Sequence, residues 1–263
     1  MHSIWIGYDP RETEAFAVCR RTLRDHAGHL PINPLDLSEL RRVGLYQRRH
    51  EQRDDGRIYD AISDAPMSTE FAISRFLTPI LARKGLALFM DCDIICRDAL
   101  DDLFALAAAD ASKAVWVVKH DYIPSNTVKM DGQLQTLYAR KNWSSVMLFN
   151  CDHPSNKALT VGMINSVPGR DLHRFCWLQD DEIGALPAKY NHLVGITHAS
   201  EDPVLVHFTN GGPWFGGEYV DVDYGDEWLN VRRQWLAEDT YVPGRPFTWD
   251  GVKTEASHVA YLR

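Results

Sequence analysis

The stretch that decides the fold runs from Gly85 to Asp102 and reads GLALFMDCDIICRDALDD. Its apolar run over 86–90 has the length of a strand buried on both faces, and Asp91 and Asp93 follow directly. In an open parallel sheet, ligands bind beyond the carboxyl ends of the strands. Two hard oxygen ligands at this spacing suit one divalent cation, whose open positions can carry the phosphates of a substrate.

The local sequence alone leaves a second interpretation of the Asp-x-Asp pattern open, because the same pattern occurs in ordinary turns and helix caps. The next stretch, 99–109, predicts a helix with Asp98 as its N-cap. Asp101 and Asp102 then lie in the first helical turn, where negative charge suits the helix dipole. These three acids have structural roles that the Asp-x-Asp pair does not share.

The composition restricts the class of protein. A chain of 263 residues is long enough for one sizeable α/β domain, and we expect a single domain over 1–263. The net charge of −8 argues against an extended basic face for duplex DNA, so we do not expect nucleic acid as a partner. The five cysteines are an odd number without CxxC pairs, which predicts reduced thiols in a cytoplasmic protein.

The hydropathy pattern predicts a soluble protein. No run approaches the roughly 18 apolar residues of a membrane span, and the N-terminus lacks the charged and apolar regions of a signal peptide. Peripheral membrane contact and a homo-oligomer both stay open. We expect exposed aromatic residues near Trp228, Trp235 and Trp249, which suit a dimer contact or an acceptor platform.

Apolar runs and helical periodicity divide the chain into alternating elements. We expect strands over 3–7, 86–90, 114–119, 145–151 and 204–208, and helices over 10–27, 68–84, 99–109, 157–167 and 226–237. The charge-dense segment 41–66 predicts a solvated surface segment or a mobile flap. Arg75 is a charge in the middle of the nearly all-apolar helix over 68–84, and an anion is one candidate partner. The long polar loop over 120–143 indicates a functional segment, with Lys129 available for contacts.

Four further groups of residues each allow a structural and a functional interpretation. Tyr8 and Asp9, which close the first strand, suit either ordinary turn chemistry or contacts to a base and a ribose. The acidic patch at 177–187, with consecutive acids at 180–182, is either a helix start or part of a site. His207 suits either the core or a metal, and the glycines at 211 and 212 form either a plain loop or a phosphate contact.

Taken in their order along the chain, several motifs resemble those of the family 8 glycosyltransferases, of the glycogenin and bacterial galactosyltransferase type, over residues 3 to about 215. The motifs that carry the resemblance are IWIGYD at 4–9, MDCD at 90–93, NWSSVMLFN at 142–150 and HFTNGGPW at 207–214. The resemblance implies a GT-A fold, which is a Rossmann-like open mixed sheet, largely parallel, with helices on both faces. It divides the chain into a nucleotide-binding part (about 1–119), a donor-sugar and acceptor part (about 120–217) and a C-terminal helix and tail (218–263).

The resemblance also implies an activity and a set of site residues. The activity is transfer of a sugar from a nucleotide-sugar, with UDP-sugar as the expected donor, to an unknown acceptor with retention of anomeric configuration. Asp91, Asp93 and His207 would hold Mn²⁺ or Mg²⁺. The donor-binding residues would be Tyr8, Asp9, Arg75, Asp91, Cys92, Lys129, Ser144, Gly211 and Gly212. The catalytic residues would be Asn142, Asp180 and Asp181, with a covalent and a front-face route both open.

One position departs from the family pattern. The family usually carries a lysine just before the Pro-Trp of the last motif, where it neutralises the diphosphate, and this chain has Gly212 there. We expect Arg75, Lys129 or an arginine of the 41–57 segment to replace that lysine.

Three rival functions remain. A haloacid-dehalogenase-type phosphatase also has Asp-x-Asp after a buried strand and would use Asp91 as nucleophile, although its strand usually lies near the N-terminus and is followed by Thr or Val where this chain has Ile95. A non-catalytic nucleotide-sugar-binding or metal-binding protein is the second. A nucleotidyltransferase is weakened by the lack of a Gly-rich loop after the first strand. We expect an acceptor to lie between the 120–143 loop and the C-terminal tail.

Overall fold

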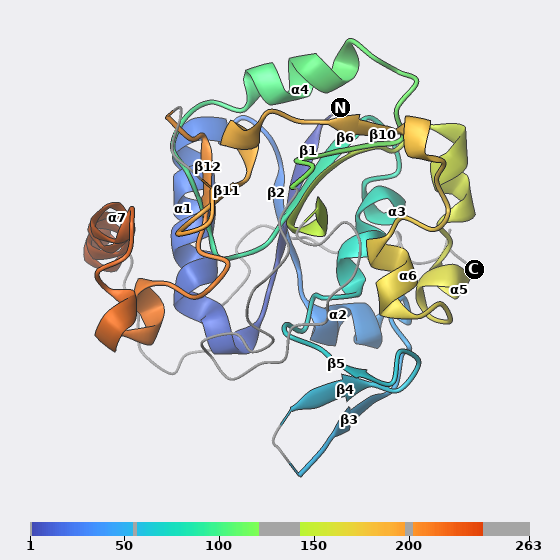
Figure 1. Cartoon of the computed structure of the whole chain (residues 1–263), viewed down its shortest axis with the longest axis horizontal. Helices are drawn as coiled ribbons and strands as arrows, with labels where there is room; N and C mark the ends of the chain where they lie inside the picture. Colours follow the sequence, from blue (N-terminus) through green and yellow to red (C-terminus); the bar gives the residue numbers. More distant parts are fainter. Residues whose placement is uncertain (1, 55–56, 121–142, 198–201, 239–263) are drawn as a thin grey trace.

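Strand β6 (Leu86–Met90) is an interior strand of a six-stranded sheet, and all five of its residues are buried. The sheet has the order β10-β8-β9-β6-β1-β2, and three of its five pairings are parallel. Figure 1 shows helix α1 (Thr13–Ala27) and helix α3 (Thr78–Ala82) on opposite sides of this sheet. The predicted open mixed sheet with flanking helices is therefore confirmed. The computed structural model describes residues 2–54, 57–120, 143–197 and 202–238.

The remaining elements complete the main sheet, two smaller three-stranded sheets and the helical layers. The other strands are β1 (Ser3–Gly7), β2 (Ile32–Leu35), β3 (His50–Gln52), β4 (Ile58–Asp60), β5 (Ala65–Pro66), β7 (Ile94–Cys96), β8 (Val115–Val117), β9 (Val146–Asn150), β10 (Ile183–Ala185), β11 (His192–Leu193) and β12 (Leu205–His207). The other α-helices are α2 (Leu37–Arg42), α4 (Asp101–Ala108), α5 (Val161–Ile164), α6 (Gly169–His173) and α7 (Gly225–Glu238).

Five predicted strands are present, and two edge strands of the main sheet were missed. Strand β2 contains Pro34 and buries only Leu35, so it shows no apolar run. Pro is tolerated at a sheet edge because no neighbouring strand needs its missing N–H. Strand β10 at the other edge is three residues long and follows an acidic stretch. Short edge strands carry little hydrophobic pattern, which explains both omissions.

The predicted helix over 68–84 is wrong in its first half. The structure has turns up to Ile73, a 3-10 helix over Ser74–Leu77 and the α-helix α3 only over Thr78–Ala82. Ser68 is therefore not a helix N-cap. Pro79 lies in the first turn of α3, where its missing N–H costs nothing, so it starts this helix instead of kinking a longer one.

Two other helical predictions need correction. The stretch 157–167 forms a 3-10 helix (Pro154–Ala158) and the four-residue α5, with Thr160 as the N-cap of α5. Helix α4 begins after Leu100, so Asp98 is not its N-cap, although Asp98 accepts a hydrogen bond from the backbone of Ala99. Asp101 and Asp102 do lie in the first turn of α4, as predicted.

The charge-dense segment 41–66 is not simply a solvated surface. It contains the three-stranded antiparallel sheet β3-β4-β5, which projects from the body of the molecule in Figure 1. Arg48 at its base is 1 % exposed and forms an ion pair with Asp60, which is equally buried. Arg48 Nη1 also donates to the carbonyl oxygens of Ile164 and Val167 at 2.7 Å each, so a buried arginine anchors this sheet to the body.

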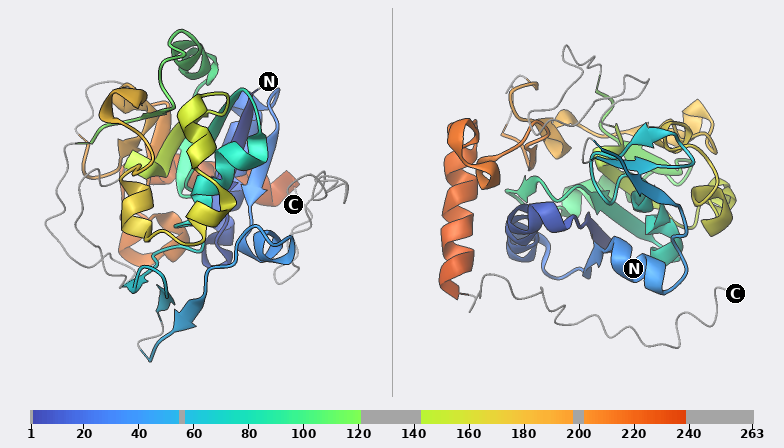
Figure 2. Two further views of the ribbon diagram at one scale, coloured as in Figure 1. Left: turned by 90° about the vertical axis from the view of Figure 1, so that its right-hand side faces the viewer. Right: turned by 90° about the horizontal axis from the view of Figure 1, so that it is seen from below.

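The third sheet, β11-β12-β7, lies beside α1 and supports the C-terminal helix α7. Figure 2 shows α7 along one side of the molecule, next to α1. Arg232 of α7 forms a double hydrogen bond with Glu14 of α1 at 2.9 and 2.8 Å. Trp228 and Trp235 are 1 % and 6 % exposed, so the expectation of an exposed aromatic platform at these two residues is wrong. Trp249 lies outside the described residues.

Two chemical features of the chain complete the description of the fold. All five cysteine thiols are free. Among the described residues, no helix combines the length and the apolar character that crossing a membrane requires.

Candidate metal and donor site

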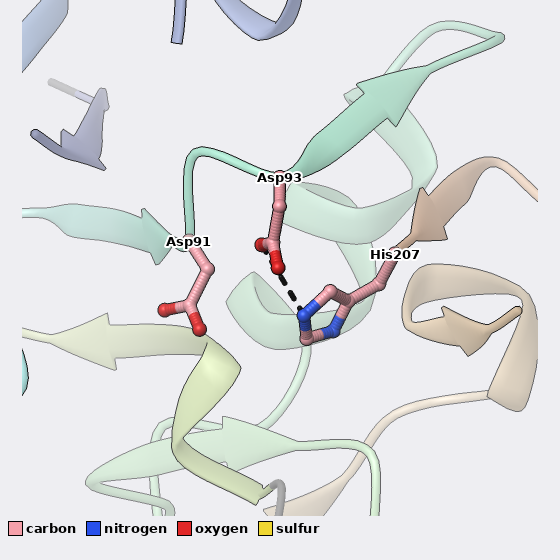
Figure 3. Close-up of side chains that lie close together, drawn as sticks. All are labelled: Asp91, Asp93 and His207. Atoms are coloured by element: carbon pink, nitrogen blue, oxygen red, sulfur yellow. Dashed lines mark ion pairs between the residues drawn. The ribbon is translucent and has the colours of Figure 1, made fainter. Parts of the chain in front are cut away.

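Two aspartates and a histidine come together where the main sheet meets the sheet β11-β12-β7. Asp91 directly follows β6, Asp93 directly precedes β7, and His207 ends β12. Figure 3 shows the three side chains pointing toward one another. One ligand atom from each lies within 4.8 Å of the others, so the sequence-based expectation that they meet is confirmed.

The local backbone explains why these side chains converge. Strand β12 pairs antiparallel with β7, and this register places His207 opposite Ile94. The amide of Phe208 donates to the carbonyl of Asp93 at 2.9 Å, which continues the ladder past the histidine. On the other side, the amide of Asp91 donates to the carbonyl of Ser145 at 2.9 Å. The short loop between β6 and β7 is therefore fixed at both ends.

Arg75 is the charged neighbour of Asp91. It is 5 % exposed, its Nη1 lies 2.9 Å from Asp91 Oδ1, and the same nitrogen donates to the carbonyl of Ser144 at 2.8 Å. Its guanidinium carbon lies 5.3 and 5.0 Å from the ring centres of Phe71 and Phe89. A charge buried at this depth needs a partner, and Asp91 supplies it. Arg75 thus lies at the site, as predicted.

His207 has a partner on each ring nitrogen. Its Nε2 lies 3.2 Å from Asp93 Oδ1, and its Nδ1 lies 3.0 Å from Asn191 Oδ1. Asn191 is completely buried, and its Nδ2 donates to Ser145 Oγ at 2.9 Å. Asn191 was not predicted from the sequence, and Ser145 appeared only within the motif at 142–150. A lone asparagine shows no periodicity or spacing, so no sequence signal could have found it.

The donor set fits a divalent cation. Metal–ligand bonds of about 2.0–2.6 Å place two donors of one ion at most about 5 Å apart, and the three ligand atoms meet that limit. Two carboxylates and one imidazole suit Mn²⁺, because carboxylates suit Mg²⁺ and Mn²⁺ while imidazole is bound by softer transition metals. Three protein ligands also leave positions for phosphate oxygens.

At the end of β1, the carboxylate of Asp9 is taken up by hydrogen bonds that stabilise the local turn. Asp9 is fully buried, and its carboxylate accepts from the backbone and side chain of Arg11 and from the amide of Glu70. It caps the 3-10 helix Pro10–Glu12. Tyr8 is half-buried, with its ring edge-on to Phe16 at 5.2 Å. The turn interpretation therefore describes Asp9, and a base contact by Tyr8 stays a prediction.

The loop after His207 contains Gly211 and Gly212, and the backbone conformation at Gly211 favours glycine. Gly211 has a φ of 110°, a value that side-chain-bearing residues rarely adopt. A Cβ on Gly212 would lie 2.2 Å from a ring carbon of Trp214. The Trp214 ring therefore occupies the space that a Cβ at position 212 would take in this structure.

Two further histidines interact with residues of the candidate site. Ser144 is buried, and its Oγ lies 2.6 Å from His173 Nδ1 of α6. Burial, and secondly the charge of His207, lower the pKa of His120 to about 4. Sequence reasoning missed both histidines, since each is an isolated residue in a polar stretch.

Cys92 lies between the two aspartates of the loop. Its side chain is fully buried and its Sγ donates to Glu12 Oε2 at 3.4 Å. Burial, followed by the charge of Glu12, raises the pKa of the Cys92 thiol well above its ordinary value. Any donor contact by Cys92 would therefore use its backbone.

Asp180 and Asp181 lie at the wrong edge of the sheet for the predicted catalytic role. They precede β10, whose Ile183 pairs with Val115 of β8, at the edge where β6 begins. Asp91 and Asp93 lie beyond the end of β6, so the sheet separates the two acidic groups. Both Asp180 and Asp181 are exposed, in a 3-10 helix capped by Gln179. The interpretation of this acidic patch as a helix start is the correct one. Asn142 and Lys129 lie outside the described residues.

Similarity to known proteins agrees with this geometry. Protein CDI from Arabidopsis thaliana is 41 % identical over 243 residues, which cover 90 % of this chain and 88 % of CDI. The chain belongs to the CDI family. No protein-family model matches the CDI-family chain.

Solved structures similar to this CDI-family protein are glycosyltransferases with the GT-A fold. The glycosyltransferase GlyE of Streptococcus pneumoniae TIGR4 is 14 % identical with a TM-score of 0.55, and the match covers 94 % of this chain and 67 % of GlyE. Galactosyltransferase LgtC, solved with donor and acceptor sugar analogs, is 12 % identical with a TM-score of 0.55, covering 93 % of this chain and 98 % of LgtC. The CDI-family chain therefore has the GT-A fold.

Proposed function

We propose that this protein is a metal-dependent glycosyltransferase that moves a sugar from a nucleotide-sugar to a hydroxyl acceptor. The observation that carries the proposal is the Asp91–Asp93–His207 cluster at the carboxyl edge of a GT-A sheet. Ligands of open α/β sheets bind at that edge. A UDP-sugar donor, retention of anomeric configuration and membership of a family 8-like group belong to the same proposal, and the motif resemblance supports them.

The strand order supports a particular orientation of the donor. Strands β6, β1 and β2 are neighbours, and strands lie about 4.8 Å apart, so the ends of β6 and β2 are separated by roughly 10 Å. With the diphosphate at Asp91 and Asp93, the nucleoside would extend over the ends of β1 and β2. Tyr8 lies there, with its amide donating to the carbonyl of Leu35 at 3.1 Å. The side chain of Tyr8 is our candidate for a contact to the base.

Residues around the cluster would stabilise the leaving nucleoside diphosphate. When bound, the ion would act as a Lewis acid on the diphosphate. Arg75 is our candidate for the cation that replaces the missing lysine, because it lies at the cluster, whereas the buried Arg48 is committed to Asp60. The backbone at Gly211 and Gly212 is our candidate for contacts to phosphate oxygens, since glycine has no side chain of its own to hinder a close approach. Ser144, held by His173, is our candidate for a contact to the donor sugar.

The test is the thermal stability of the purified protein with nucleoside diphosphates and nucleotide-sugars, each with and without Mn²⁺. A ligand that binds only the folded state raises the melting temperature by an amount set by its concentration over Kd. We expect a shift with UDP or a UDP-sugar that requires the metal and is absent in the Asp93→Ala variant. No shift with any nucleotide, together with phosphate release from simple phosphoesters, would establish the phosphatase instead.

Two further measurements test whether the protein is catalytic and whether the anomeric configuration is retained. Donor binding without turnover on a panel of saccharide and other hydroxyl acceptors, and without donor hydrolysis, would indicate a non-catalytic nucleotide-sugar-binding protein. Product anomers determined by NMR would distinguish retention from inversion. A cytoplasmic location, expected from the sequence, stays part of the proposal.

A further inference from the structure

The side chain of Asn191 bridges the two sheets that build the metal cluster. It lies between the 3-10 helix Ala188–Tyr190 and β11, and it is completely buried. Its Oδ1 lies 3.0 Å from His207 Nδ1, and its Nδ2 donates to Ser145 Oγ at 2.9 Å. Ser145 in turn accepts the amide of Asp91 on its carbonyl oxygen. Asn191 is thus linked to His207 directly and to Asp91 through one residue.

The chemistry of an amide decides what this bridge does to His207. An amide oxygen only accepts hydrogen bonds, so a bond between Asn191 Oδ1 and His207 Nδ1 requires the proton to be on Nδ1. The lone pair of the neutral ring is then on Nε2. Nε2 lies 3.2 Å from Asp93 Oδ1, which is also an acceptor. Two lone pairs at this separation repel each other unless a positive charge lies between them.

We infer that Asn191 is a positioning residue, which holds His207 in the Nδ1–H tautomer and so directs the Nε2 lone pair at the cation shared with Asp91 and Asp93. The inference rests on the proposed metal site. Hydrogen-bond partners of the non-ligating nitrogen fix the tautomer and orientation of histidine ligands in this way, and removing them costs about 10- to 100-fold in metal affinity. Asn191 acts through His207 and touches no substrate.

The Asn191→Leu variant keeps the branched shape and the number of heavy atoms of the side chain, and it removes the acceptor for Nδ1–H. Asn191→Asp keeps an acceptor for Nδ1–H, and Ser145 can donate its hydroxyl to the new carboxylate. A matched control is Asn156→Leu. Asn156 is also buried and donates to the carbonyls of Ala114 and Asn150 at 2.8 Å each, but it lies at the edge where β6 begins.

The first measurement is Mn²⁺ affinity without nucleotide, from the free-ion signal in electron paramagnetic resonance. We expect Asn191→Leu to bind Mn²⁺ about 10- to 100-fold more weakly than the wild type, and Asn191→Asp to recover most of that loss. Asn156→Leu should lose stability but keep wild-type Mn²⁺ affinity. Equal Mn²⁺ affinity of Asn191→Leu and the wild type would overturn the inference.

The second measurement needs no metal. Nitrogen-15 shifts of the His207 ring in the metal-free protein, recorded at a pH where those shifts show a neutral ring, report which nitrogen carries the proton. We expect Nδ1–H in the wild type and a loss of this preference in Asn191→Leu. A wild-type Nε2–H tautomer would overturn the inference, because the amide would then be donating to Nδ1. A wild type with the Nδ1–H tautomer that fails to bind Mn²⁺ would contradict the proposed function and leave the tautomer assignment standing.

Discussion

Arg75 Nη1 lies 2.9 Å from Asp91 Oδ1, with the two side chains 6 % and 15 % exposed. A carboxylate that would bind a divalent cation is therefore already paired with a buried guanidinium. The same nitrogen donates to the carbonyl of Ser144, so its position is fixed by the backbone as well as by charge. A cation bound at Asp91 must share the carboxylate with Arg75.

The first prediction concerns Arg75→Met. Removing one partner of a buried ion pair costs about 3–5 kcal/mol, because the remaining charge loses its partner. In the metal-free variant, we expect the melting temperature to fall. Mn²⁺ should raise it more in the variant than in the wild type, because the ion replaces the missing positive charge beside Asp91.

Arg48→Met is the matched control for Arg75→Met. It also breaks a buried ion pair, with Asp60, but at the base of the β3-β4-β5 sheet. We expect a similar loss of stability and a wild-type response to Mn²⁺. Equal Mn²⁺ shifts in all three proteins would contradict a role for Arg75 in balancing the charge of Asp91.

The second prediction concerns Asp93→Ala, which removes one carboxylate from the cluster. We expect nucleotide-sugar turnover to be abolished while circular dichroism shows an intact fold. The exposed Asp98, a few residues along the same stretch, provides the control variant Asp98→Ala, which should keep its activity. Wild-type turnover by Asp93→Ala would mean that the metal assignment is wrong.

The third prediction concerns Gly212→Lys, which restores the lysine found at this position in family 8. Because a Cβ here would lie 2.2 Å from the Trp214 ring, the ring has to move, and overpacking of this kind costs about 1–3 kcal/mol. We expect a lower melting temperature and no gain in donor affinity. A stable variant with tighter donor binding would show that the loop accommodates a lysine after all.

The fourth prediction concerns the pH dependence of stability. Burial, and secondly the charge of Arg41, lower the pKa of His50 to about 4, from about 6.5 in the unfolded chain. Between these two values the unfolded state binds a proton that the folded state does not, so the free energy of unfolding falls as the pH falls. The contribution is present above about pH 6.5 and is lost toward pH 4.

The variant His50→Gln tests this pH dependence. It should flatten the dependence of unfolding free energy on pH, measured by urea denaturation at several pH values between about 4 and 7. The change should stay below the full one-proton slope of about 1.4 kcal/mol per pH unit, because His50 is partly exposed to solvent. An unchanged slope would show that His50 does not titrate abnormally.

The sequence predicted the central strands from their apolar pattern, and the family resemblance grouped Asp91, Asp93 and His207, which the structure brings together. The strands over 3–7 and 86–90 have the predicted bounds, since a continuous apolar run marks a strand buried on both faces. His207 and the two aspartates belong to motifs whose order along the chain is itself informative.

The sequence could not reveal features that depend on long-range contacts. Arg48 lies in a charge-dense segment, and nothing local shows that Asp60 and two distant carbonyl oxygens bury it. The family resemblance placed Asp180 at the site, and the sequence does not say at which sheet edge an acidic turn lies. Asn191 acquires its role only through His207, which belongs to another strand.

The pairing of β7 with β12 also has a consequence for biosynthesis. A ribosome-bound chain that has already made the Asp-x-Asp loop still lacks the histidine that faces it, because β12 is synthesised much later. Contacts between such distant segments form slowly, since the loop between them must close first. If the proposed metal site binds its cation through all three ligands, the nascent chain would complete that site only after most of its residues have emerged, and metal loading would then report that folding has been completed.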